Sequence, residues 1–341
     1  LNGFDNLFKP FLNAGLRSLE AVGGALLAVS QEEDFVQNEW PPELVEKVLS
    51  RGVEVHEIGL EEAAARQVVA IDTSSIIAAA GRRGVVAAVR GAIAVRSGLG
   101  VRVERVGPFI AYVTRDNMAE VLASVLDGSA PLDYSSFDYQ LDGSISKILA
   151  SLLEKRLQEY VAERFRNSIL LFDGSLSAGP LDNPLWLVTK IIEKALPRGN
   201  DILAFSKNSI LQFWGEILTD EKLGASPPYA ADLTWIIKSI EMRVKVLGKT
   251  YLAKLSPRAN AFRVDAATNR KIEEVFGSLL KSDALIYGYP ELLVLAHDYC
   301  TFTKLDLIAI QTLLEQKGSK IFESPSIRNM LFNPLDGEWG K

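Results

Sequence analysis

The sequence predicts an α/β fold in which a mixed β-sheet is flanked by helices, with extra helices at the N-terminal and C-terminal ends. Two short apolar runs of strand length each end in an aspartate followed by small residues, at Asp72 and at Asp173. Two more apolar runs and a long stretch with helical periodicity lie between them. Buried strands that alternate with helical stretches predict a sheet with helices packed on its faces.

The N-terminal segment is predicted to be helical. Apolar residues recur at gaps of three and four through residues 1–30, which predicts one or two amphipathic helices. The apolar stripe consists of Phe4, Leu7, Phe8, Phe11, Leu12, Leu16, Leu19 and Val22. It either packs on the chain's own domain or contacts a second copy or a partner. Another helix is expected from residue 41, because proline is favoured in the first helical turn.

Three strands come next. Residues 67–72 predict a buried central strand that ends at Asp72, and residues 84–95 and 101–113 predict two more. Gly98 and Gly100 suit a hairpin turn between the last two. Short connections between successive strands indicate an antiparallel meander.

Predicted helices and strands alternate over residues 144–206. A helix is predicted over residues 144–166, a strand over 167–173, a helix over 185–196 and a strand over 201–206. Residues 244–255 and 261–264 predict a second hairpin, and the remainder is expected to be helical up to a tail after Ser324. A meander followed by helix, strand, helix and strand is the pattern of an RNase H-like core.

Amino-acid composition and the absence of certain motifs narrow the classes of function that the chain can have. Hydrophobic residues make up 48% and charged residues 23% of 341 residues, an ordinary globular balance. The net charge of −6 means that DNA binding would need a local basic groove or a partner. A single cysteine fits a reducing cytosol, and no stretch reaches the ~20 apolar residues of a membrane span, so we expect a cytoplasmic protein. The sequence contains no phosphate-binding glycine loop and no serine-nucleophile elbow, which disfavours nucleotide-driven motors and serine hydrolases.

Asp72 and Asp173 are the main candidates for chemistry. A buried ionised carboxylate is costly unless a positive group lies beside it. If the two strands are neighbours, the carboxylates face each other and need a divalent cation or a shared proton. The alternative is that each aspartate only caps a turn or a following helix.

Other candidates are less specific. Glu154 lies at the edge of its helix's apolar stripe and can point toward the sheet, although spacing alone favours a solvent-facing side chain, as expected for Glu159 and Glu163. His297 follows apolar residues, a pattern that favours a buried structural histidine, and His56 is interpreted as structural. Carboxylates suit magnesium or manganese, whereas a structural zinc site would need more histidine or cysteine.

These motifs together resemble the NurA nuclease family of archaea and some bacteria. The matching pieces are Val-Ala-Ile-Asp72-Thr-Ser, the helix with Glu154, Leu-Leu-Phe-Asp173-Gly-Ser-Leu, Ala-Phe-Ser-Lys207-Asn-Ser, Ala-Phe-Arg263-Val-Asp, and Gly-Tyr-Pro290 through Ala-His297. They occur in family order over residues 66–300, with Asp72-Thr-Ser where the family usually has Asp-Gly-Ser.

The resemblance implies an RNase H-like nuclease domain over residues 61–324, a helical region over 1–60 that contacts a second copy or a partner, and a tail over 325–341. It implies a homodimer that cleaves DNA with manganese, or magnesium, at a site of two ions held by Asp72, Glu154, Asp173 and His297. Lys207 and Arg263 would lie on the substrate path. The family acts as a 5′-to-3′ exonuclease and single-strand endonuclease, with the hexameric HerA translocase, in resection of double-strand breaks. Two alternatives remain: an RNase H-like or Piwi-like ribonuclease, and a non-catalytic scaffold that binds the translocase.

Overall fold

The structure is a computed structural model. It describes residues 4–20, 26–28, 52–61, 63–98, 100–125, 144–179, 183–206, 220–240, 245–257, 259 and 261–322. The helix expected from residue 41, Lys207 and the tail over 325–341 lie outside the described residues. No helix in the described ranges is long and apolar enough to cross a membrane.

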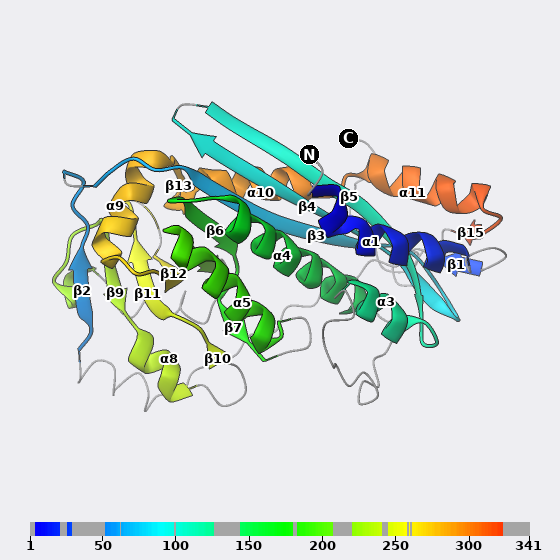
Figure 1. The fold of residues 1–341 in the computed structure, drawn as a ribbon, viewed down its shortest axis with the longest axis horizontal. Coiled ribbons are helices and arrows are strands. Elements are labelled where there is room, and N and C mark those ends of the chain that lie inside the picture. The colour runs from blue at the N-terminus through cyan, green and yellow to red at the C-terminus, as the bar shows by residue number, and fades with distance from the viewer. Residues whose placement is uncertain are drawn as a thin grey trace, which may run out of the picture.

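One 11-stranded mixed sheet organises the molecule (Figure 1). Its strands are β1 (Leu26–Ala28), β2 (Glu54–Glu57), β3 (Val68–Gly81), β4 (Gly84–Ser97), β5 (Gly100–Thr114), β6 (Ile169–Asp173), β8 (Asp201–Ser206), β9 (Tyr229–Asp232), β11 (Lys249–Lys254), β12 (Phe262–Ala267) and β15 (Lys320–Phe322). The order is β15-β1-β3-β6-β8-β12-β11-β9-β2, and β4 pairs with β3 and β5. Two separate two-stranded antiparallel pairs join β7 (Ser177–Ala178) to β10 (Lys245–Val246) and β13 (Leu285–Ile286) to β14 (Tyr289–Pro290).

The pairing directions confirm the predicted mixed sheet. Strands β3, β4 and β5 form the antiparallel meander. Strand β6 then adds parallel to β3, and β8 adds parallel to β6. The predicted second hairpin is the antiparallel pair β11 and β12.

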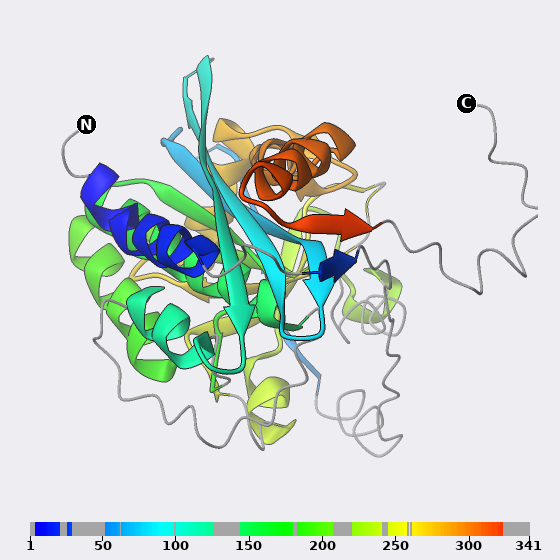
Figure 2. The same cartoon turned by 90° about the vertical axis from the view of Figure 1, so that its right-hand side faces the viewer.

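The helices cover both faces of the sheet (Figures 1 and 2). They are α1 (Phe4–Leu19), α3 (Met118–Val125), α4 (Ser144–Arg164), α5 (Leu185–Ala195), η3 (Leu196–Arg198), α7 (Asp220–Leu223), α8 (Thr234–Ile240), α9 (Ile272–Ser282), α10 (Glu291–Cys300) and α11 (Lys304–Gln316). Because strand side chains alternate between faces, Val69 and Ile71 join the core beneath α1, α3, α4 and α5. Val68 and Ala70 join the core beneath α9 and α10.

A glycine lets α4 approach the sheet closely. An added Cβ at Gly91 in β4 would lie 2.4 Å from Cδ1 of Leu157 in α4. Leu157 is fully buried, so its side chain occupies the space that a larger residue at position 91 would need.

The N-terminal helix packs on its own chain. Phe8 and Phe11 are buried, and both rings contact Phe109 of β5. Leu12 and Leu16 remain exposed on the other side of the helix. Among the described residues of the stripe, Phe8, Phe11 and Leu19 thus belong to the chain's own core, and Leu12 and Leu16 are exposed.

Three expectations about the elements were wrong. The strand through Asp72 does not end there but continues to Gly81. Residues 26–28 form a strand rather than helix, and the C-terminal part contains β13, β14 and β15 besides its helices. In each case a tertiary partner decides the conformation: β4 pairs along the whole of β3, and β1 pairs with β15, about 290 residues later in the chain.

Candidate active site

The two candidate aspartates lie on adjacent parallel strands. Ile71 of β3 is the register partner of Phe172 of β6, so Asp72 and Asp173 come next on the two strands. Strand β6 ends at Asp173. Since Ile71 and Phe172 both belong to the core beneath α4, the alternation directs both aspartates to the opposite face, toward α10. The two strands are thus neighbours, as the prediction required, but Asp72 lies within β3 rather than at its end.

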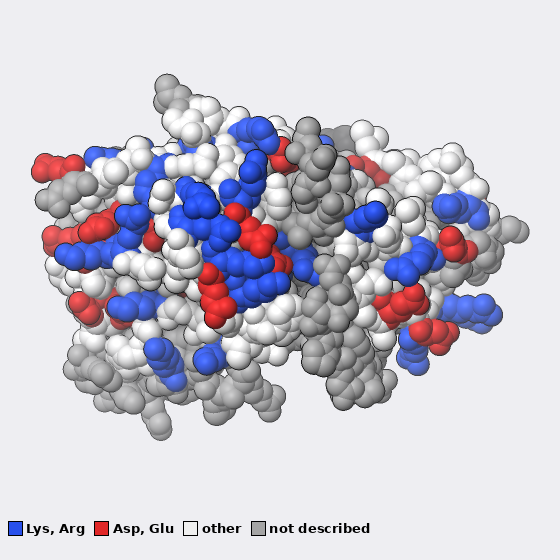
Figure 3. Space-filling model, in the orientation of Figure 1, with Lys and Arg blue, Asp and Glu red and all other residues white. Residues whose placement is uncertain are grey.

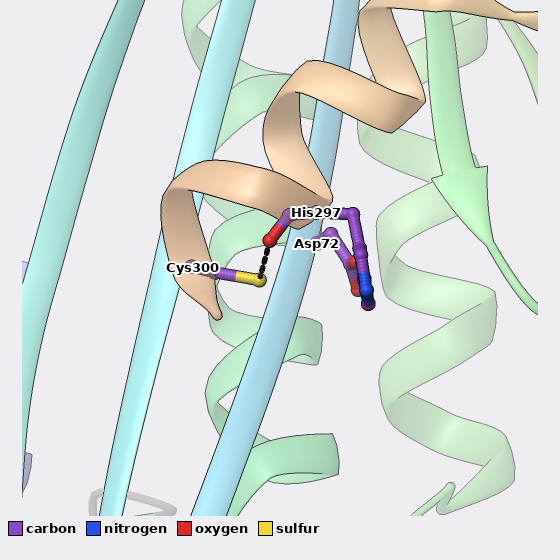
Figure 4. A group of neighbouring side chains, drawn as sticks. All are labelled: Asp72, His297 and Cys300. Carbon is purple, nitrogen blue, oxygen red and sulfur yellow. Dashed lines mark hydrogen bonds and ion pairs between the residues drawn. The ribbon is translucent and has the colours of Figure 1, made fainter. Parts of the chain in front are cut away.

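His297 of α10 completes the contact with Asp72 (Figure 4). Its Nδ1 lies 2.7 Å from Asp72 Oδ2, while Asp72 Oδ1 accepts a hydrogen bond from the backbone N–H of Thr73 at 2.7 Å. The side chain of Asp72 is 6% exposed and that of His297 is 48% exposed. The buried structural histidine that the local pattern favours is therefore not what the fold produces: one side of the ring holds the aspartate and the other side faces solvent.

Polar contacts fix the C-terminal end of α10 to the sheet. The hydroxyl of Ser74 in β3 donates to the carbonyl of Cys300. Arg90 in β4, with a nearly buried side chain, donates to both carboxylate oxygens of Asp306 at 3.1 and 2.6 Å, and its guanidinium lies 4.5 Å from the ring centre of Phe302. These contacts hold the segment after α10 against β3 and β4, and so hold His297 over Asp72.

Tyr289 is a site residue that residue-level reasoning did not single out. Its hydroxyl donates to Asp173 Oδ1 at 3.0 Å. Burial raises the pKa of Tyr289 strongly, and the negative charges of Asp173, Asp72 and Glu154 raise it further. The phenol therefore stays protonated and keeps donating to the carboxylate. The only sequence signal was its place in the matching Gly-Tyr-Pro290 segment.

Cys300 lies beside the histidine and carries a protonated thiol. Ligand atoms of Asp72, His297 and Cys300 lie within 4.8 Å of one another. Burial raises the pKa of the thiol well above its usual range, and the charge of Asp72 raises it further. A metal binds the thiolate rather than the thiol, and here the Sγ–H donates to the carbonyl of His297 at 3.2 Å (Figure 4).

Glu154 belongs to α4, which packs on the sheet face opposite to that of α10. Its Oε1 accepts a hydrogen bond from Gln158 at 2.6 Å and lies 3.8 Å from Lys155 Nζ. The side chain is 16% exposed, so the solvent-facing alternative does not hold. Its negative charge contributes to the raised pKa of Tyr289.

The two other glutamates of α4 differ from each other. Glu163 is partly exposed as expected, but Glu159 is buried and pairs with Arg156, Lys190 and Lys194. Burial raises the pKa of Glu159, yet the two lysines outweigh that effect and hold it below its usual value. On the face that carries α4 and α5, acidic and basic groups alternate instead of forming a uniform basic patch (Figure 3).

Arg263 lies at the same edge of the sheet. It pairs in register with Ser206, the last residue of β8, one strand beyond β6. Its guanidinium donates to both oxygens of the buried Asp265 at 3.0 and 2.9 Å. Lys207 follows Ser206 directly and lies outside the described residues.

The family of this chain follows from comparison with sequence profiles of known protein families. The sequence profile of the NurA domain family matches residues 66–301, well over half of the chain, and spans every candidate residue above.

This chain belongs to the NurA family.

Similar solved structures are distant. The NurA nuclease from Sulfolobus solfataricus is 16% identical, with 81% of this chain and 91% of that chain covered and a TM-score of 0.47. Endonuclease V from Bacillus subtilis is 9% identical, with 80% and 92% covered and a TM-score of 0.34. Endonuclease V from Ciona intestinalis, in complex with a 24mer DNA, is 14% identical, with 79% and 94% covered and a TM-score of 0.37. Curated proteins show no match to this chain. The assignment to the family therefore depends on the sequence profile, and the description of the fold depends on the sheet of this structure itself.

Proposed function

We propose that this NurA-family protein is a divalent-metal-dependent deoxyribonuclease. Its active site, which hydrolyses phosphodiester bonds of DNA, would consist of Asp72, Asp173, Glu154 and His297. The observation that carries the proposal is that Asp72 and Asp173 directly follow the register partners Ile71 and Phe172 on β3 and β6, with His297 in contact with Asp72. Membership of the NurA family supports a nuclease independently of that geometry.

The residues fit a divalent metal. Buried carboxylates on adjacent strands repel each other unless a cation or a proton lies between them. Three carboxylates and one imidazole are oxygen-rich donors of the kind that manganese or magnesium prefers, and we propose manganese, with two ions in the site. When bound, the metal supplies a water of lowered pKa and neutralises the charge that develops on the phosphate oxygens.

The chain's own groups have distinct roles in this proposal. An ionised carboxylate only accepts hydrogen bonds, so Nδ1 of His297 is the nitrogen that donates to Asp72. That contact orients the ring and occupies Nδ1. Nε2 is therefore the nitrogen that would bind a metal or protonate the leaving 3′ oxygen. Tyr289 orients Asp173 in the same way through its hydroxyl. We assign contact with the DNA backbone to Arg263 and Lys207, the two basic residues of the matching motifs.

The biological setting is part of the same proposal. We infer 5′-to-3′ exonuclease and single-strand endonuclease activity in the resection of DNA double-strand breaks, by a cytoplasmic homodimer that receives DNA from a hexameric HerA-type translocase. The net charge of −6 and the mixed charges over α4 and α5 support a partner that delivers the DNA. We also keep residues 61–324 as the nuclease domain, preceded by a partner-contacting region over 1–60 and followed by a tail over 325–341.

A nuclease assay tests the activity. The purified protein is incubated with manganese, magnesium or a chelator and with 5′- or 3′-labelled single-stranded DNA, double-stranded DNA and RNA. We expect manganese-dependent release of nucleotides from 5′ ends of DNA and cutting of single strands. Preferential cleavage of RNA would instead support the ribonuclease alternative, and no cleavage with any metal would support the scaffold.

A surface variant tests the assembly. Leu12 and Leu16 are 49% and 55% exposed on α1, although the neighbouring aromatic residues are buried. Light scattering should show a dimer for the wild-type chain, and Leu12→Glu with Leu16→Glu should shift it toward the monomer or weaken translocase binding. Leu185→Glu, at a leucine that is 44% exposed on α5, is the matched control. Unchanged assembly in the double variant would rule out α1 as the interface.

A further inference from the structure

A second cluster of metal-ligand types lies at the far edge of the sheet. Glu54 and His56 of β2 and Asp232 of β9 bring one carboxylate oxygen, one ring nitrogen and one carboxylate oxygen within 4.8 Å of one another. Strand β2 is the last in the sheet order, six strand spacings from β3, so the cluster lies roughly 29 Å from Asp72 at ~4.8 Å per spacing. It is therefore separate from the candidate active site.

Strand pairing creates the cluster. Glu54 is the register partner of Asp232, and His56 lies two residues further on the same face of β2. Nε2 of His56 is 3.9 Å from Glu54 Oε1. Two carboxylates that face each other across a strand pair destabilise the pairing unless a positive group lies between them.

His56 is oriented as a metal-ligating histidine usually is. Its Nδ1 lies 2.7 Å from Oε1 of Glu273 in α9, and its ring packs edge-on against Tyr251 with centroids 6.0 Å apart. Because an ionised carboxylate can only accept, Nδ1 carries a proton, and in the neutral imidazole Nε2 then presents its lone pair. Nε2 is buried and makes no hydrogen bond to any residue that the structure describes, although it faces the carboxylate of Glu54. A lone pair buried against a negative charge is unfavourable, whereas the same arrangement around a cation is favourable.

The neighbouring polar groups neutralise the charges of the cluster only in part. Oδ1 of Asp232 accepts from the backbone N–H of Thr234 at 2.8 Å. Oδ2 lies 3.6 Å from Lys249 Nζ, whose side chain is 63% exposed and can be displaced. Among the described residues, Lys249 pairs with Asp232 and with neither Glu54 nor His56, so the lysine does not neutralise the whole cluster.

We propose that Glu54, His56 and Asp232 bind one first-row divalent transition-metal ion, with Glu273 orienting the imidazole. One imidazole and two carboxylates favour such an ion over calcium or magnesium. Ligands at ~2.1 Å from a tetrahedral ion lie about 3.4 Å apart, slightly closer than the present spacing. Glu54, whose side chain is 74% exposed, has the freedom to close that gap. The ion would fasten the short edge strand β2 to β9, independently of nuclease activity.

The chain offers a direct probe, since it contains only two histidines. In His297→Gln protein labelled with ¹⁵N-histidine, every imidazole signal comes from His56. Addition of Zn²⁺ should shift the Nε2 resonance to a metal-bound position while Nδ1 keeps its proton. The shift should vanish in the same background with Glu54→Gln and Asp232→Asn, which keep the size of both side chains. Glu273→Gln should weaken Zn²⁺ binding by about 10- to 100-fold, as loss of an orienting carboxylate usually does.

Thermal unfolding provides a second readout. Zn²⁺ should raise the melting temperature of the His297→Gln protein, because an ion that binds only the folded state stabilises it, and this rise should be lost when Glu54 and Asp232 are neutralised. A His56 signal that stays unchanged by Zn²⁺, or that shows a doubly protonated imidazolium paired with Glu54, would overturn the proposal. Equal Zn²⁺ affinity with and without the two carboxylates would overturn it as well.

Discussion

Nδ1 of His297 lies 2.7 Å from Oδ2 of Asp72, although 225 positions separate them in the chain. The contact joins the centre of β3 to the last turn of α10, and it is held there by Ser74 and by the Arg90–Asp306 pair. The site is thus built on rigid elements rather than on loops, which suits chemistry that requires fixed positions.

Asp72→Asn should abolish metal-dependent DNA cleavage while the fold is retained. The substitution keeps the size of a buried side chain but removes the charge that orients His297 and that we propose binds a cation. Cleavage of end-labelled DNA measures the activity, and circular dichroism checks the fold. Asp116→Asn, in the turn after β5, is a control that should retain full activity. Turnover of Asp72→Asn near the wild-type level would remove Asp72 from the mechanism.

His297→Gln should lower the cleavage rate by about 10²- to 10⁴-fold if the imidazole acts as a general acid. The limb of the pH–rate profile that reports this proton should also disappear, because glutamine does not titrate. Single-turnover rates between pH 5 and 9 test both effects. A slower enzyme with an unaltered pH profile would instead indicate that His297 only positions Asp72 or a metal.

Tyr289→Phe should lower activity or metal affinity by about 10- to 100-fold, less than loss of an aspartate, because it removes only the orienting hydrogen bond. The phenylalanine keeps the aromatic contacts with Phe205 and Phe262. Manganese titrations of the rate separate weaker binding from slower chemistry. Tyr112→Phe, a buried tyrosine of β5 outside the site, controls for loss of a phenol elsewhere.

The Arg90–Asp306 pair should make stability depend on pH. The hydrogen bonds from Arg90 hold the pKa of Asp306 well below its usual range, with further help from the backbone of Thr303. A depressed folded-state pKa adds stability that is complete above the unfolded pKa of about 3.9 and is lost as the pH falls through the folded value. The difference in unfolding free energy between wild type and Asp306→Asn should therefore be constant from pH 7 to about 5 and shrink below about 4.

Urea unfolding at several pH values measures that difference. Asp298→Asn, at an exposed carboxylate of the neighbouring helix, is the matched control and should show little destabilisation at any pH. A difference for Asp306→Asn that persists unchanged at pH 3 would mean that the pair contributes through packing or capping and not through charge.

Gly91→Ala should destabilise the fold by about 1–3 kcal/mol, because the new methyl group overlaps Cδ1 of Leu157. Leu157→Ala should relieve that overlap, so the double variant should lose less than the sum of the two single variants. Urea denaturation of the four proteins gives the coupling free energy. Strict additivity would show that α4 shifts away from β4 without resistance.

Local pattern alone determined much of this protein. The apolar runs before Asp72 and Asp173 predicted buried strands, and both are central strands of the sheet. The periodicity of residues 144–166 predicted α4 to within two residues. These features are local because the burial of a whole strand or of one helix face requires a repeating apolar pattern in the sequence itself.

The tertiary structure decided how the site is assembled. Nothing local indicates that β3 extends past Asp72, that Glu159 is buried among lysines, or that the half-exposed ring of His297 lies on Asp72. The hydrogen bond of Tyr289 to Asp173 and the contact of His56 with Glu273 likewise join residues that are more than a hundred positions apart in the chain. Such contacts depend on strand register and helix packing, which join distant segments, so no window of neighbouring residues contains the information.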